Sequence, residues 1–105
     1  MALVFVDGRN VQRSQWPNLS DEELVRRARD WAERNGHEVV LVFDGDAPAG
    51  AIGSRSESAD DWLIREVPQH PGAWLVTSDR ALRDAAGTQA DRIIGGGGFL
   101  RELKK

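Results

Sequence analysis

Three apolar runs in this chain each end in an aspartate. The runs cover residues 2–6, 39–43 and 74–78, and the aspartates that follow them are Asp7, Asp44 and Asp79. If the runs form neighbouring parallel strands, their carboxyl ends meet at one edge of a sheet and bring the three side chains together. Crowded carboxylates repel one another unless a cation lies among them. The pattern therefore predicts a divalent-metal site.

Each aspartate also has an ordinary structural explanation. Asp7 and Asp44 are both followed by glycine, and Asp-Gly is a common turn pair. Asp79 suits the first turn of a helix because of the helix dipole. Three such residues at matching strand ends are harder to explain by turn chemistry alone, so the metal site is the favoured interpretation.

Helical segments alternate with these runs. Ser20 and Glu23 form a capping-box pattern before a helix that we expect to end at Asn35-Gly36. The other expected elements are a turn-rich stretch over 7–18, a loop over 45–53 with a short strand over 52–56, a helix over 58–67, a helix over 79–86 capped by Ser78, a strand over 92–94, a glycine loop over 95–98 and a helix over 99–104.

This alternation predicts the fold class. Continuous apolar strands separated by helices indicate an α/β, three-layer sandwich with a mostly parallel central sheet. The length of 105 residues fits one domain, over residues 1–105. Ligands bind outside the carboxyl ends of the strands in such sheets, where the three aspartates are expected.

A further acidic group begins the helix expected at residue 58. Asp60 is predicted to point toward the same sheet edge while Ala59 and Leu63 pack inward. Asp61 ranks below it because it can pair with Arg65 at i,i+4. Acids near a helix N-terminus are also expected on electrostatic grounds alone.

Composition limits the class of protein. The net charge of −3 is unlike that of a nucleic-acid-binding surface. The absence of cysteine excludes disulfides and thiolate metal sites, and fits a cytoplasmic protein. A strand expected directly after Met1 leaves no room for a signal peptide, and no apolar stretch approaches the roughly 20 residues of a membrane span.

Four motifs in order give the chain a family resemblance. They are Val6-Asp7-Gly8-Arg9-Asn10, Val42-Phe43-Asp44-Gly45, Glu57-Ser58-Ala59-Asp60 and Val76-Thr77-Ser78-Asp79-Arg80. Together they resemble the NYN branch of PIN-like nucleases, and most of all its YacP-like group. Arg9 stands where that group usually has tyrosine, Ser58 replaces a threonine, and the segment between Asp44 and Glu57 is shorter than is typical.

The resemblance implies a PIN-like fold with sheet order 3-2-1-4-5 and a Mg²⁺- or Mn²⁺-dependent ribonuclease activity. By motif, Asp7, Asp60 and Asp79 would be the metal ligands and, with Asp44 and Asn10 at the border of the site, would form the catalytic set. Glu57 and Ser78 would lie just behind the ligands.

Side chains around the proposed site suggest how RNA is held. Arg9, Arg55, Arg80 and Arg83 are candidates for contacts to the phosphate backbone, with solvated surface charge as the alternative. Trp16 is predicted either to stack on a base or to cover the sheet edge. We interpret Trp31, Trp62 and Trp74 as core residues, and His37 and His70 as surface residues.

Other functions fit less well or stay open. Haloacid-dehalogenase phosphatases and receiver domains also cluster strand-end aspartates, but both need a lysine near the site, and the only lysines are Lys104 and Lys105. A PIN-like adaptor that binds RNA or protein without cutting is an alternative, as is the toxin of a toxin–antitoxin pair. PIN-like domains often pair, so a homodimer is also an expectation.

Overall fold

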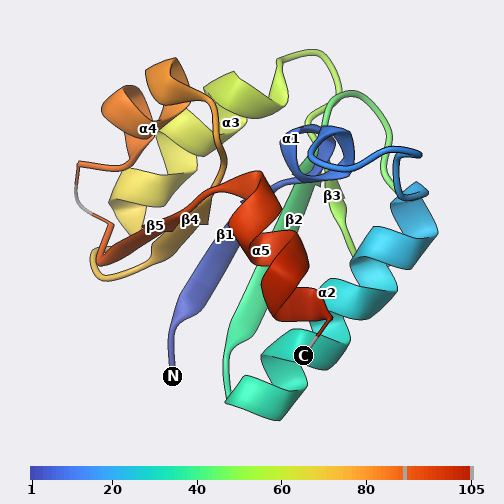
Figure 1. The fold of residues 1–105 in the computed structure, drawn as a ribbon. Helices are drawn as coiled ribbons and strands as arrows, with labels where there is room; N and C mark the ends of the chain where they lie inside the picture. Colours follow the sequence, from blue (N-terminus) through green and yellow to red (C-terminus); the bar gives the residue numbers. More distant parts are fainter. Residues whose placement is uncertain (89, 105) are drawn as a thin grey trace.

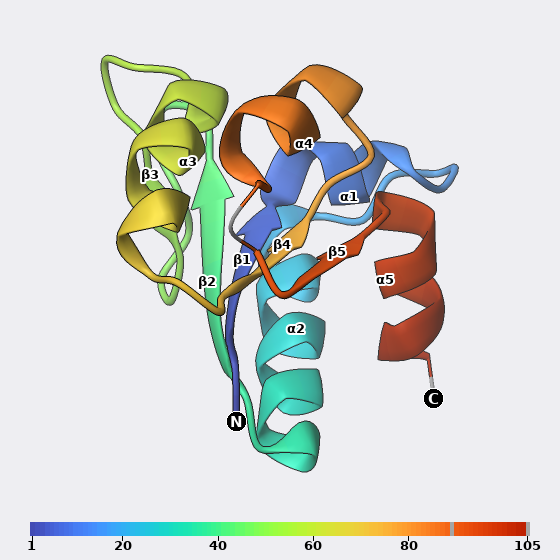
Figure 2. The same ribbon diagram turned by 90° about the vertical axis from the view of Figure 1, so that its left-hand side faces the viewer.

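The computed structural model describes residues 1–88 and 90–104 and shows a sheet between two layers of helices (Figures 1 and 2). In the described residues the strands are β1 (Leu3–Asp7), β2 (Glu38–Phe43), β3 (Ile52–Gly53), β4 (Trp74–Val76) and β5 (Arg92–Ile94). The helices are α1 (Gly8–Arg13), α2 (Asp21–Asn35), α3 (Ala59–Glu66), α4 (Arg80–Ala86) and α5 (Gly96–Leu103), with a 3-10 turn η1 over Val67–Gln69.

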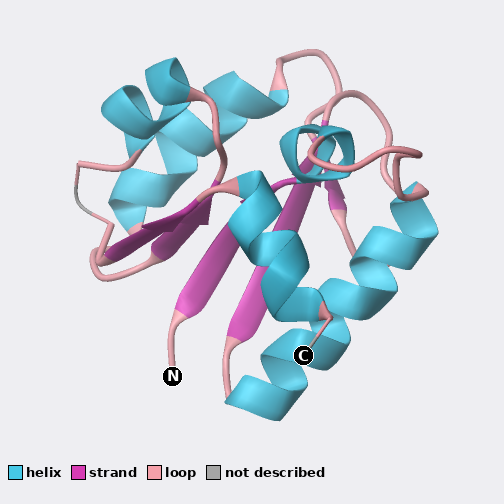
Figure 3. Cartoon of the chain, viewed as in Figure 1, coloured by secondary structure: helices cyan, strands magenta, loops and turns pink. Residues whose placement is uncertain are grey.

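The strand order confirms the predicted fold class. The sheet runs β3-β2-β1-β4-β5, and every pairing is parallel. Helices α1, α2 and α5 cover one face and α3 and α4 the other (Figure 3). Because all strands point the same way, their carboxyl ends share one edge of the sheet.

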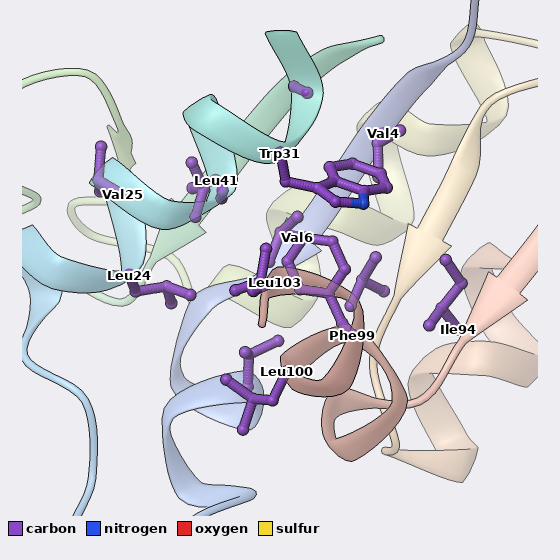
Figure 4. Close-up of a cluster of buried hydrophobic side chains, with 14 of the residues drawn as sticks. Val4, Val6, Leu24, Val25, Trp31, Leu41, Ile94, Phe99, Leu100 and Leu103 are labelled. Carbon is purple, nitrogen blue, oxygen red and sulfur yellow. The ribbon is translucent and has the colours of Figure 1, made fainter. Parts of the chain in front are cut away.

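Alternate residues of each strand serve the two faces of the sheet. Val4 and Val6 pack under α2 and α5, while Phe5 between them packs under α3 and α4. Figure 4 shows the larger cluster, in which Trp31 meets Phe99 edge-on with ring centroids 5.0 Å apart. Both faces of the central strands are buried, which explains their continuous apolar sequence.

The core prediction for the tryptophans is confirmed. Trp31 is buried, and Trp62 and Trp74 are partly buried against the two core clusters. The surface interpretation of His37 is wrong: its ring is half-buried and packs against Trp31 and Trp74. His37 Nδ1 accepts a hydrogen bond from the Ala2 N–H at 3.0 Å, so the imidazole fastens the start of β1. His70 is exposed as expected.

Two helices differ from the prediction. The turn-rich stretch after Asp7 contains α1, although its short sequence with Gly8 and Asn10 has little helical preference. Tertiary packing forms it, because Gly8 and Val11 are buried. Likewise the glycine run is not a loop, since α5 begins at Gly96.

Close packing explains the glycine at each of these helix starts. A Cβ on Gly8 would lie 2.7 Å from the Phe43 ring, and one on Gly96 would lie 2.3 Å from the Ser14 Oγ atom. Both positions therefore require glycine so that backbone can approach a neighbouring element. Gly97, by contrast, has only the Arg101 side chain near, at 3.8 Å.

This contrast predicts opposite effects of two alanine substitutions. Gly8→Ala should lower the free energy of unfolding by about 1–3 kcal/mol, because the buried Phe43 ring cannot move aside without strain. Gly97→Ala should raise it by up to about 1 kcal/mol, because alanine fits there and restricts the unfolded chain. Urea unfolding measures both, and a Gly8→Ala protein as stable as wild type would contradict the close approach.

Candidate metal and catalytic site

Four carboxylates line one hollow at the carboxyl edge of the sheet. Asp7 ends β1, Asp44 follows β2, Asp79 follows β4, and Asp60 is the second residue of α3. The hollow has a volume of about 170 Å³, and the other residues that line it are Arg9, Asn10, Arg13 and Ser58. The structure thus brings together all five residues predicted as catalytic, three of which are the predicted metal ligands.

Asp7 is the buried member of this group, with 6% of its surface exposed. Its Oδ2 accepts a hydrogen bond from the Thr77 hydroxyl at 3.0 Å. Burial is the largest of the effects that raise the pKa of Asp7, and the charges of Asp60 and Asp44 also raise it, while hydrogen bonds from Thr77 and the Asn10 backbone lower it. Together these effects bring the pKa from 3.8 to about 6. The surroundings of Asp7 therefore disfavour the charged form of its carboxylate.

Two of the other carboxylates are fixed by backbone N–H groups. Asp44 Oδ1 accepts from the Ala59 N–H at 2.8 Å, and Asp79 Oδ1 accepts from the Leu82 N–H at 3.1 Å, which caps α4. The pKa of Asp60 is raised mainly by burial and then by the charges of Asp79, Asp44 and Asp61. The hollow thus concentrates negative charge that its own hydrogen bonds only partly offset.

A hydrogen-bonded frame holds the loop that follows β4. The Thr77 hydroxyl accepts from the Asp79 N–H at 3.1 Å, Asn10 Oδ1 accepts from the Ser78 N–H at 2.8 Å, and Ser78 Oγ accepts from the Gly96 N–H at 2.8 Å. The predicted cap of α4 by Ser78 is therefore wrong, because Asp79 caps that helix and Ser78 binds the start of α5. Sequence reasoning also overlooked Thr77, whose hydroxyl joins two of the aspartates.

The predicted arginines divide into two groups. Arg9 lines the hollow, where its guanidinium binds Asp21 at 2.8 Å and lies over the Phe43 ring. Arg55 lies instead beside Gly45 and Asp46, and Arg80 and Arg83 are exposed on α4 outside the lining of the hollow. Of the four predicted arginines, Arg9 is therefore the one that lines the hollow itself.

Arg13, which the sequence reasoning missed, is exposed at the rim of the hollow. Its position could be inferred only once α1 was known, because Arg9 and Arg13 are one turn apart on that helix and therefore lie on the same side of it.

One expectation about a nearby acid is also corrected. Arg65 does not pair with Asp61, because its guanidinium contacts Glu57 at 2.5 Å and Glu66 at 3.1 Å. Glu57 does not line the hollow, and its carboxylate contacts Arg65. The acidic residues that line the hollow are therefore the four aspartates.

The donor set suits a hard divalent cation, because only oxygen atoms are offered by the four aspartates. Among the residues that the structure describes, however, no group of three or more acidic, histidine or cysteine side chains is arranged as a ready-made metal site. The chemistry of the hollow fits Mg²⁺ or Mn²⁺, while the close ligand geometry for an ion is not already assembled.

Comparison with known proteins identifies the architecture. A crystal structure of a mutant of Rae1 (YacP) from Bacillus subtilis matches with a TM-score of 0.79 and 21% sequence identity, over 99% of this chain and 76% of that one. A second crystal structure of Rae1 matches with a TM-score of 0.72 and 20% identity, over 99% and 74% of the two chains. This chain has the fold of Rae1 (YacP).

The YacP-like, PIN-like fold predicted from four short motifs is thereby confirmed. The Rae1 fold covers nearly the whole of the present chain, so the short segment between Asp44 and Glu57 does not interrupt it. No protein-family model and no curated protein sequence matches the chain.

The raised pKa of Asp7 predicts how stability depends on pH. A carboxyl with a raised folded-state pKa binds more protons in the native state, so its contribution to stability falls as the pH rises from about 4 to about 6. Asp7→Asn removes the charge and should stabilise the metal-free protein at pH 7.5 by on the order of 2 kcal/mol. The advantage should vanish at pH 3.5.

Urea unfolding at both pH values measures this difference. The matched control is Asp61→Asn, which changes a carboxyl outside the lining of the hollow and should have a small effect. A destabilised Asp7→Asn protein at pH 7.5 would show that the Asp7 charge is not held at a cost.

Proposed function

We propose that this chain is a Mg²⁺- or Mn²⁺-dependent ribonuclease that hydrolyses phosphodiester bonds of RNA in the cytoplasm. The observation that carries the proposal is the gathering of four aspartates, from three strand ends and one helix start, around one hollow. The likeness of the fold to Rae1 (YacP) and the four motifs of the YacP-like group support it.

Asp7, Asp60 and Asp79 are the residues proposed to hold the ion. The bound ion would supply an activated water and neutralise charge on the phosphate. Asp7 stays in place through its hydrogen bond from Thr77, and Asp79 through the α4 cap. Asp44 borders the site from the end of β2, and Asn10 keeps the loop after β4 in position by accepting from the Ser78 N–H.

The size of the hollow favours a polymer over a small free substrate. At about 170 Å³ it is smaller than the roughly 300–1,000 Å³ of typical small-molecule sites. A phosphodiester linkage can enter it while the rest of an extended chain lies outside. The exposed guanidinium of Arg13 at the rim is placed to contact a backbone phosphate.

Lysine-dependent phosphatase chemistry gains no support. Lys104 follows α5 and lies in a separate hollow beside Arg26 and Arg34, away from the residues that line the carboxylate hollow.

The structure describes no helix long and apolar enough to cross a membrane among residues 1–88 and 90–104. A homodimer stays a prediction.

Cleavage of labelled RNA tests the proposal. Wild-type protein should cleave with Mn²⁺ or Mg²⁺ and lose activity in EDTA. Asp60→Asn and Asp79→Asn should each lower the rate on the order of 100-fold or more, because a charged ligand is lost. Asparagine can still cap α4 at position 79, so the fold should survive.

The neighbouring Asp61→Asn provides the matched control, since Asp61 is on α3 but does not line the hollow. Its rate should stay within a few-fold of wild type. Activity that persists in EDTA and in Asp79→Asn would contradict the metal mechanism. Binding of RNA without cleavage under either metal would favour the adaptor alternative.

A further inference from the structure

Trp16 is the feature of the surface that the proposed activity does not explain. Its side chain is 89% exposed, in the segment that joins α1 to α2. This segment projects from the body of the molecule beside α1 (Figure 2). The alternative that Trp16 covers the sheet edge is therefore wrong. An exposed indole leaves both faces of a large aromatic ring open to a partner.

The surroundings of Trp16 do not resemble a protein interface. Exposed neighbours in the same segment include Arg13, Ser14 and Asn18, and the other large exposed apolar residues of the described chain, Met1, Ile52 and Ile64, lie in other segments. A stable protein interface needs a contiguous apolar centre within about 800 Å² per partner. A single aromatic ring among polar and basic groups is typical of nucleobase stacking.

Trp16 is also tied to the carboxylate hollow. Arg13, which lines the hollow, is three residues away along the chain, so the two Cα atoms are at most about 11 Å apart. The segment is anchored at its start, where the Ser14 hydroxyl donates to the Asn10 carbonyl at 2.8 Å, and near its end, where Gln12 Nε2 donates to the Leu19 carbonyl at 3.1 Å.

We propose that Trp16 stacks on an unpaired base of the RNA, next to a backbone phosphate held by Arg13. The proposal rests on the proposed ribonuclease function and names its substrate class. The faces of paired bases are covered by their neighbours in a duplex, so the substrate is single-stranded RNA or the loop of a folded one. Trp16 binds and positions this strand; the chemistry belongs to the aspartates.

The test is a double-mutant cycle between Trp16 and one nucleobase. A short unpaired RNA is compared with the same RNA carrying abasic nucleotides beside the cleaved linkage, against wild type, Trp16→Ala and Trp16→Phe. Binding is measured in EDTA, where no cleavage occurs, and cleavage is measured separately with Mn²⁺. Ile64→Ala, which removes another exposed apolar side chain, is the control.

Trp16→Ala should weaken binding of the intact RNA by about 5- to 150-fold, and Trp16→Phe by much less, because an aromatic ring remains. On the abasic RNA, wild type and Trp16→Ala should bind equally. Indole fluorescence should be quenched by RNA in wild type but not in Trp16→Phe, since the other tryptophans are packed against the core.

Equal affinities of wild type and Trp16→Ala for the intact RNA would overturn the inference. If wild type still cleaved the RNA at its normal rate with Mn²⁺, the proposed ribonuclease function would nevertheless stand. An equal loss on intact and abasic RNA would overturn stacking too. A change of oligomeric state in Trp16→Ala, with unchanged RNA affinity, would assign Trp16 to a protein contact instead. A Trp16-dependent affinity without any cleavage would support the inference and contradict the ribonuclease.

Discussion

A buried carboxylate at the end of the central strand is the constraint on which this structure depends. Asp7 ends β1, which lies between β2 and β4, and its neighbours give it hydrogen bonds from one hydroxyl and one backbone group where water would otherwise solvate it. Burial and two neighbouring aspartates oppose its charge. A protein selected for stability alone would place an apolar residue there. The free-energy cost of burying this carboxylate indicates that Asp7 serves the chemistry of the site rather than the stability of the fold.

The rest of the edge is built to hold charge without neutralising it. Backbone N–H groups at the starts of α3 and α4 fix Asp44 and Asp79, while two nearby arginines make their ion pairs with other acids: Arg9 with Asp21, and Arg65 with Glu57. Among residues 1–88 and 90–104, no arginine or lysine forms an ion pair with the four aspartates, so their carboxylates are open to a cation from solution. This arrangement explains how an acidic chain can bind a phosphate polymer. The four aspartates concentrate negative charge, and a cation from solution would offset that charge and contact the phosphate.

The sequence predicted the sheet and the aspartates well because both follow from local rules: continuous apolar strands, Ser20 as a cap, and residues at strand ends. It failed where tertiary contacts decide. Gly8 and Gly96 read as turn and loop residues, yet each is the point where two elements approach too closely for a Cβ. Thr77 was interpreted as a strand residue, and the hydrogen bond that its hydroxyl donates to Asp7 depends on a partner 70 positions away. Arg13 had no signal until α1 placed it beside Arg9.

The central claim is that the aspartates form one electrostatically coupled site for a divalent cation. Carbon NMR of the Asp7 carboxyl during a pH titration, with and without Mg²⁺, tests it most directly. Without metal the pKa of Asp7 should be about 6. Saturating Mg²⁺ should lower that pKa, and Asp60→Asn should remove most of the Mg²⁺ effect. An Asp7 carboxyl that titrates at its ordinary value, or one that Mg²⁺ leaves unmoved, would contradict the account.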